Sequence, residues 1–66
     1  MKVVIKKREE ASYLVSPGVW TTDILQAKEF KSLLSILDYR REHKLEKVEA
    51  LFCFQEAKYN FALKIS

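Results

Sequence analysis

A chain of 66 residues with 48% hydrophobic and 32% charged residues has the composition of one small folded domain, which excludes an intrinsically disordered chain. We expect a single domain over residues 1–66 that buries about 60% of the surface of its unfolded chain. The formal net charge of +3 arises in residues 2–10 and 40–47, and each of these segments also contains two acids. This bias is too mild for a polyanion-binding tail.

Cys53 is the single cysteine of the chain, which excludes the paired-disulfide framework of small secreted domains. The longest apolar run, residues 50–54, is far shorter than the roughly 20 residues of a membrane span. The first eight residues lack the charge order and apolar length of a signal peptide. We therefore expect a cytoplasmic protein without a membrane partner, in which Cys53 acts as a small hydrophobic residue.

Alternating apolar residues predict a β-hairpin in the first sixteen residues. We expect Arg8 to pair with Ser12 across the turn of residues 9–11. This register brings four apolar residues to one face of the hairpin: Val3, Ile5, Tyr13 and Val15. A Ser-Pro-Gly turn at 16–18 follows, and residues 19–21 have the pattern of a short extended piece.

The apolar spacing then changes from two residues to three and four, which predicts helix. Asp23 and Gln26 have the spacing of a capping box, so we expect a short helical turn around 23–30. Ser32 is a second candidate N-cap, which predicts the main helix from about 32 to 44. A single helix through 24–43 is the alternative.

The last twenty residues predict two further strands, about 48–54 and 60–65. A loop of residues 56–59 would pair Phe54 with Phe61, and Phe52 with Leu63, so that both apolar sets share a face. The alternative is a second helix through 45–58, because the apolar residues there also fit helical spacing.

These elements predict an α+β fold with a ββαββ order. The strands form a small antiparallel sheet, and one main helix packs on one of its faces. We expect Trp20 to be mostly buried near the start of the helix. Four side chains are expected to pack the helical region on the sheet: Ala27, Phe30, Leu34 and Leu37.

The sequence provides little for chemistry. Its single histidine, His43, lies in a charged helix end, and nothing brings it to Cys53. Nucleophilic catalysis needs a nucleophile, a base and an orienting group, and a metal site needs three or four converging ligands. We therefore predict no enzyme activity, no catalytic residue, no metal, no cofactor and no small-molecule substrate.

The basic residues at the end of the predicted helix form a candidate nucleic-acid contact. Side chains at 40, 44 and 47 share a side of a helix and could follow a phosphate backbone. A solvated helix end explains the same residues. The candidate contacts are Arg40, Arg41, Lys44 and Lys47.

An apolar second sheet face is the feature that most favours a partner. One helix can cover only one face of a four-stranded sheet, and contiguous exposed apolar patches usually mark a partner surface. We expect this patch to contain Leu51, Cys53, Leu14 and Val4. The leading hypothesis is therefore a non-enzymatic protein-interaction module that associates with a second copy or another protein through the sheet face or an edge strand. The alternative is a nucleic-acid-associated accessory protein that uses the basic helix end and the first hairpin. If strand 48–54 is central, however, the patch is merely small.

About half of the chain, residues 12–44, resembles short phage-type and bacterial proteins of unknown function. The resemblance rests on Tyr13-Leu14-Val15, Trp20-Thr21-Thr22-Asp23, Ala27-Lys28-Glu29-Phe30 and Ser32. It implies a hairpin ending in Trp-Thr, an Ala-x-x-Phe turn, a serine-capped helix and a closing strand. It further implies that Trp20 and Phe30 pack the helix on the sheet, and it suggests a phage-related or accessory role.

Overall fold

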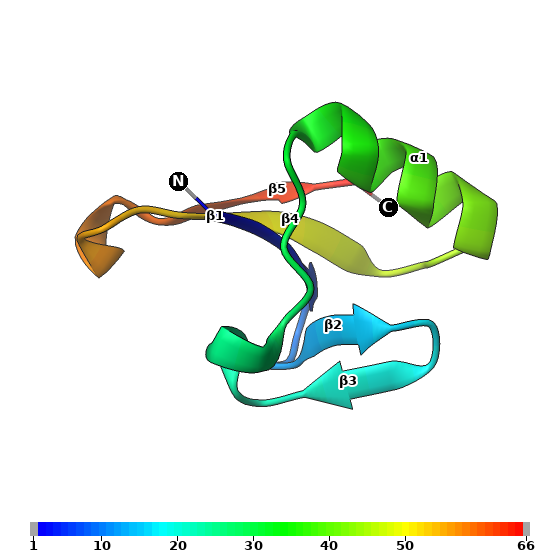
Figure 1. Ribbon diagram of the computed structural model, residues 1–66, viewed down its shortest axis with the longest axis horizontal. Helices are drawn as coiled ribbons and strands as arrows, with labels where there is room; N and C mark the ends of the chain where they lie inside the picture. The colour runs from blue at the N-terminus through cyan, green and yellow to red at the C-terminus, as the bar shows by residue number, and fades with distance from the viewer. Residues whose placement is uncertain (1, 66) are drawn as a thin grey trace.

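The computed structural model describes residues 2–65, which form a five-stranded antiparallel sheet and one α-helix (Figure 1). The predicted α+β class, with an antiparallel sheet and one main helix, is confirmed. The predicted count of four strands is one too low, because residues 19–21 form a strand of their own. The elements are β1 Lys2–Lys7, β2 Tyr13–Ser16, β3 Val19–Thr21, the 3-10 helix η1 Ile24–Gln26, α1 Leu33–His43, β4 Val48–Cys53, the 3-10 helix η2 Ala57–Tyr59 and β5 Phe61–Lys64.

The strand order is β3-β2-β1-β4-β5, so β1 lies at the centre and β3 and β5 lie at the edges. All neighbouring strands are antiparallel. The core lies between α1 and one face of this sheet, which we call the helix face. Its buried members are Val3, Ile5, Leu14, Ile36, Val48 and Ala50.

The first hairpin differs by one residue from its predicted register. Lys6 pairs with Tyr13, and the Lys7 amide donates to the Ser12 carbonyl at 3.0 Å, so the turn contains four residues rather than three. A slip of one residue exchanges the two faces of a strand. Leu14 therefore joins Ile5 in the core, and the prediction that Tyr13 takes this place is wrong.

Strands β1 and β2 separate beyond this pair, and a connecting segment fills the gap. Figure 1 shows the β2–β3 hairpin turned away from the layer of β1, β4 and β5. The Lys28 amide donates to the Leu14 carbonyl, and the Phe30 amide donates to the Val3 carbonyl, both at 2.8 Å. The segment thus satisfies backbone groups that the diverging strands leave unpaired.

The Asp23 carboxylate accepts a hydrogen bond from the Leu25 amide at the start of η1. The predicted capping box is wrong in its partner, since the Asp23 amide donates to the Thr21 hydroxyl instead of the side chain of Gln26. The predicted helical turn is thus limited to the 3-10 helix η1. The alternative of one helix through 24–43 is wrong, because the chain is extended at the end of η1.

Helix α1 begins and ends at the positions that the sequence predicts. The Ser32 hydroxyl accepts a hydrogen bond from the Ser35 amide and caps the start. Lys44 closes the end in the left-handed region (φ 53°), and its amide bonds to the carbonyls of Arg40 and Arg41. Glycine or asparagine usually holds such a position, because a Cβ is disfavoured there.

The predicted packing face of the helical region is wrong at Leu34. Ala27 is buried and Phe30 packs against the core, as predicted. Ile36 is fully buried, whereas Leu34 is 68% exposed. Leu33, which packs against the core, and Ile36 lie three residues apart on one side of α1, so Leu34 turns outward. Trp20 packs on the core but is only half-buried, so it is less covered than predicted.

The second predicted hairpin forms, which excludes the alternative helix through 45–58. Its register differs from the prediction by two residues, since Phe52 pairs with Phe61 and Ala50 with Leu63. A shift of two preserves the faces, so the apolar sets still align. The two phenylalanine rings stack with their centroids 4.6 Å apart.

Candidate functional site

The predicted apolar patch on the face opposite the helix is smaller than expected. Val4 and Leu14 are fully buried, so the prediction that they are exposed is wrong. Leu14 lies on the helix face because of the hairpin register, and Val4 lies in the central strand. The Lys2 ammonium donates to the Ile24 carbonyl at 3.1 Å, which places η1 beside the same face as Val4.

Leu51 and Cys53 are half-buried in β4 and remain together on that opposite face. The Cys53 thiol lies 3.9 Å from the Leu51 carbonyl. Burial raises the pKa of the Cys53 thiol, and the Lys2 ammonium lowers it by a smaller amount. The thiol is therefore neutral near pH 7, which is the state of a structural rather than a nucleophilic cysteine.

The larger apolar surface lies on the helix face of the β4–β5 hairpin, beyond the reach of α1. Phe61 and Leu63 in β5 are 52% and 44% exposed, and Phe54 is exposed beside them. The Phe54 and Phe61 rings lie 6.1 Å apart, and Phe61 also stacks on Phe52. We call Phe52, Phe54, Phe61 and Leu63 the aromatic cluster. It continues the core to the edge of the sheet without being covered.

Strand β5 also presents free backbone groups, because no described strand pairs with its outer side. The Ile65 amide donates to the Val48 carbonyl at 3.4 Å, so the amide at position 65 points toward β4. Amides alternate in direction along an antiparallel strand. The amides of Ala62 and Lys64 therefore point outward, and those of Phe61 and Leu63 point toward β4.

The other edge of the sheet is a poorer surface for pairing. Strand β3 has three residues and follows the turn at Pro17 and Gly18, where Gly18 adopts φ 79°. Its pairing with β2 is also irregular between Leu14 and Ser16. Short and irregular edge strands resist pairing with another chain. Strand β5 is thus the more available of the two edges.

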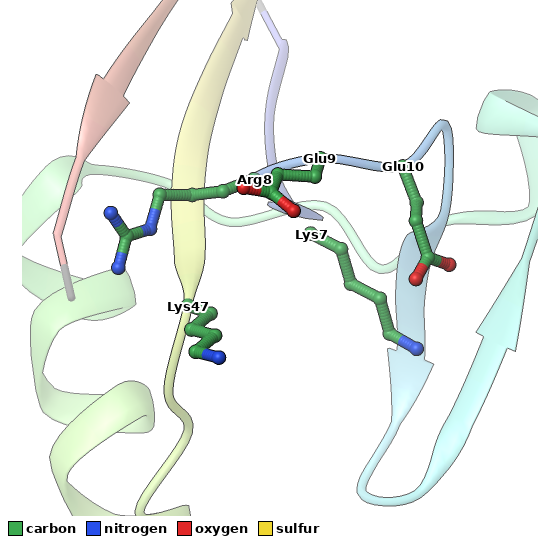
Figure 2. A pocket seen from close by; sticks show the side chains of 5 residues that line it. All are labelled: Lys7, Arg8, Glu9, Glu10 and Lys47. Atoms are coloured by element: carbon green, nitrogen blue, oxygen red, sulfur yellow. The ribbon is translucent and has the colours of Figure 1, made fainter.

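The two basic segments that lie far apart in the sequence meet at one end of the molecule. The Arg8 amide donates to the Lys47 carbonyl at 3.0 Å, which joins the first turn to the segment before β4. Figure 2 shows the five residues that line a hollow of about 270 Å³ there. They are Lys7, Arg8, Glu9, Glu10 and Lys47.

Three of the predicted nucleic-acid contacts lie in a second hollow of about 300 Å³ at the end of α1. These are Arg40, Arg41 and Lys44, and only Lys47 lies in the first hollow. Arg41 is exposed and lies 3.6 Å from the Asp38 carboxylate. The predicted set is thus divided between two hollows, and Lys7 and Arg8 of the first hairpin share one of them with Lys47.

Within residues 2–65, no group of three or more His, Cys, Asp or Glu side chains is placed to hold a metal. The single histidine, His43, instead packs its ring 4.3 Å from that of Tyr39. Burial, and to a smaller extent the Glu42 carboxylate, raises the pKa of Tyr39. These contacts belong to the packing of α1.

No family model, no curated protein and no solved structure matches this chain significantly. Among the described residues, no helix has both the length and the apolar character needed to cross a membrane.

Proposed function

We propose that this chain is a protein-interaction module that forms a homodimer by pairing β5 with β5 of a second copy. The observation that carries the proposal is the coincidence of two features on one strand. Strand β5 has an open edge, and the same strand presents Phe61 and Leu63 to solvent. Edge pairing supplies backbone hydrogen bonds, and burial of these side chains supplies the hydrophobic contribution.

The residues of β5 are complementary to themselves in an antiparallel arrangement. If Ala62 lies on the two-fold axis, its outward amide and carbonyl bond to those of Ala62 in the second copy. Phe61 then lies opposite Leu63 of the second copy, and the reverse contact repeats by symmetry. Lys64 meets Asn60 of the second copy. Both aromatic clusters thus join on one face.

This arrangement also accounts for closure at two copies. Each β5 is used once, and the remaining edge, β3, is short and irregular. We include a cytoplasmic location in the proposal, because the single cysteine, Cys53, suits a reducing compartment. An accessory role fits the resemblance stated for residues 12–44.

Sedimentation equilibrium at micromolar concentration tests the dimer. Leu63→Glu places a charge in the proposed interface, and Leu34→Glu is the matched control on the exposed side of α1. We expect dimers of the parent and of the control, and monomers of the Leu63 variant with an unchanged circular dichroism spectrum. A parent protein that stays monomeric, or a control that dissociates equally, would overturn the proposal.

Ala62→Pro provides a second variant that leaves the aromatic cluster in place. Proline removes the outward amide of Ala62, which no described residue uses, so the monomer should tolerate it. The dimer would lose two symmetry-related hydrogen bonds. Leu51→Glu, on the opposite face, distinguishes edge pairing from face stacking, because only face stacking would be disrupted by it.

A further inference from the structure

We infer that the end of the molecule formed by the first turn and the α1–β4 connection binds the phosphate backbone of a nucleic acid. This inference is independent of the β5 interface, which is built by other residues. It starts from the convergence of the two basic segments. The bond from the Arg8 amide to the Lys47 carbonyl holds them together, although they are 39 positions apart.

The basic residues there line two shallow hollows, together with Glu9, Glu10 and Glu46. Figure 2 shows Arg8 extending across β4, whereas Lys7 extends toward the β2–β3 side. The second hollow lies where α1 ends, at Arg40 and Lys44. Two separate hollows lined by basic residues suit a chain of successive phosphates better than a single small anion.

Two buried guanidinium nitrogens lack a hydrogen-bond acceptor within the described residues. The Nε atoms of Arg8 and Arg40 are both shielded from solvent and have no hydrogen-bond partner among residues 2–65. The Nη1 atom of Arg40 donates to the Leu45 carbonyl at 3.5 Å. Buried donors without a partner are uncommon in folded proteins, so neither guanidinium is fully satisfied within the fold. Phosphate oxygens are preferred acceptors of arginine.

Two lysines of this region adopt a backbone conformation that glycine would adopt with less strain. Lys44 and Lys47 both adopt the left-handed region, with φ of 53° and 55°. This region costs a residue with a Cβ about 1–2 kcal/mol relative to glycine. Both positions thus carry a cationic side chain in spite of the local backbone preference, which fits a role for its charge.

The acidic residues of the two basic segments favour one kind of polyanion over another. Residues 7–10 and 40–47 contain six basic and four acidic side chains, so the net excess is only two. An anionic membrane would meet Glu9, Glu10 and Glu46 together with the bases. A flexible strand can instead place its phosphates between the acids. We therefore expect weak, strongly salt-dependent binding of single strands without sequence preference.

Lys44→Gly combined with Lys47→Gly is the decisive variant, because glycine removes two charges and relieves the backbone at both positions. Folding should therefore survive the change. Lys31→Gln combined with Lys58→Gln removes the same charge at exposed positions outside both hollows. Fluorescence anisotropy with a labelled mixed-sequence oligonucleotide of about 16 nucleotides measures the affinity.

We expect binding at about 50 mM salt that weakens steeply toward 200 mM, and an affinity loss on the order of tenfold or more in the double-glycine variant. The slope of log K against log salt should fall in magnitude by about 1.4, since each lost phosphate contact contributes about 0.7 for a single strand. The control variant should lose clearly less affinity.

Four results would overturn the inference. The first is no binding at low salt, and the second is an equal loss in the control and double-glycine variants. The third is an affinity for a dinucleotide or for inorganic phosphate that matches the longer strand, because the site would then serve a small anion. Vesicles containing phosphatidylserine provide the comparison with a membrane surface, and binding to them that equals binding to the oligonucleotide would also contradict it.

Discussion

Truncation of Ile36 tests how α1 is attached to the sheet. Ile36 is the one fully buried side chain within residues 33–43, and it packs in the cluster that contains Val3 and Ile5. Replacement of a buried isoleucine by alanine costs about 2–5 kcal/mol, because the lost contacts leave a cavity. We expect about 3 kcal/mol for Ile36→Ala, which is a large part of the ~5–10 kcal/mol available to a small domain.

Leu34→Ala is the matched control on the same helix. Leu34 is largely exposed, so its truncation should change the free energy of unfolding by less than about 0.5 kcal/mol. For a domain of this size, about 3 kcal/mol corresponds to a decrease in Tm of at least about 12 °C.

Urea denaturation followed by circular dichroism and by the fluorescence of Trp20 measures both variants. All samples need the same protein concentration, because dimerisation would couple to stability. The slope of the unfolding free energy against urea concentration should stay unchanged, because nearly the same surface is exposed on unfolding. If Leu34→Ala were as destabilising as Ile36→Ala, the orientation of α1 on the sheet would be wrong.

Three further predictions concern single sites. Ser32→Ala removes the cap of α1 and should lower the free energy of unfolding by about 1 kcal/mol in thermal denaturation, and an unchanged stability would contradict the capping role. Lys44→Gly should raise the free energy of unfolding by about 0.5 kcal/mol, since relief of the left-handed backbone exceeds the entropic cost of glycine, whereas a decrease would show that the lysine side chain stabilises the fold. Because burial raises the pKa of Cys53, iodoacetamide should alkylate the folded protein more slowly than the urea-unfolded chain near neutral pH, and the reaction should accelerate only above the ordinary thiol pKa. Equal alkylation rates in the folded and unfolded states would contradict this expectation. The same raised pKa means that the contribution of Cys53 to stability is present at neutral pH and is lost as the pH rises through the folded-state pKa.

The sequence predicted the type of a helix or strand correctly where neighbouring residues determine it. Ser32 precedes an apolar run with helical spacing, and its hydroxyl caps α1 as predicted. The alternation around Phe52 and Phe61 predicted two strands with aligned faces, and an error of two residues in register did no harm. Local patterns thus specify type and face well.

The register of the first hairpin and the orientation of α1 on the sheet were predicted less well from the sequence. The turn after β1 lacks glycine and asparagine, so nothing local fixed its length, and the one-residue error reversed the roles of Tyr13 and Leu14. In α1, Leu33, Leu34, Ile36 and Leu37 are all apolar, so the spacing fits more than one face. Contact with the sheet selects Ile36.

The candidate surfaces depend on strand order, which no local pattern determines. The exposure of β5 follows from its place beside β4 at the edge of the sheet. The meeting of Arg8 with Lys47 follows from the pairing of β1 with β4 over more than 40 positions. Apolar and basic residues were recognised in the sequence, but their grouping required the tertiary fold.

Hydrogen exchange of individual amides by NMR tests the β5 interface most directly, because it reports on the edge itself in the unmodified protein. The amides of Ala62 and Lys64 point away from β4, and that of Leu63 points toward it. We predict that exchange at Ala62 and Lys64 slows as the protein concentration rises from micromolar to millimolar, while Leu63 is protected throughout. Unprotected exchange at Ala62 and Lys64 in a sample that sediments as a dimer would contradict pairing through β5.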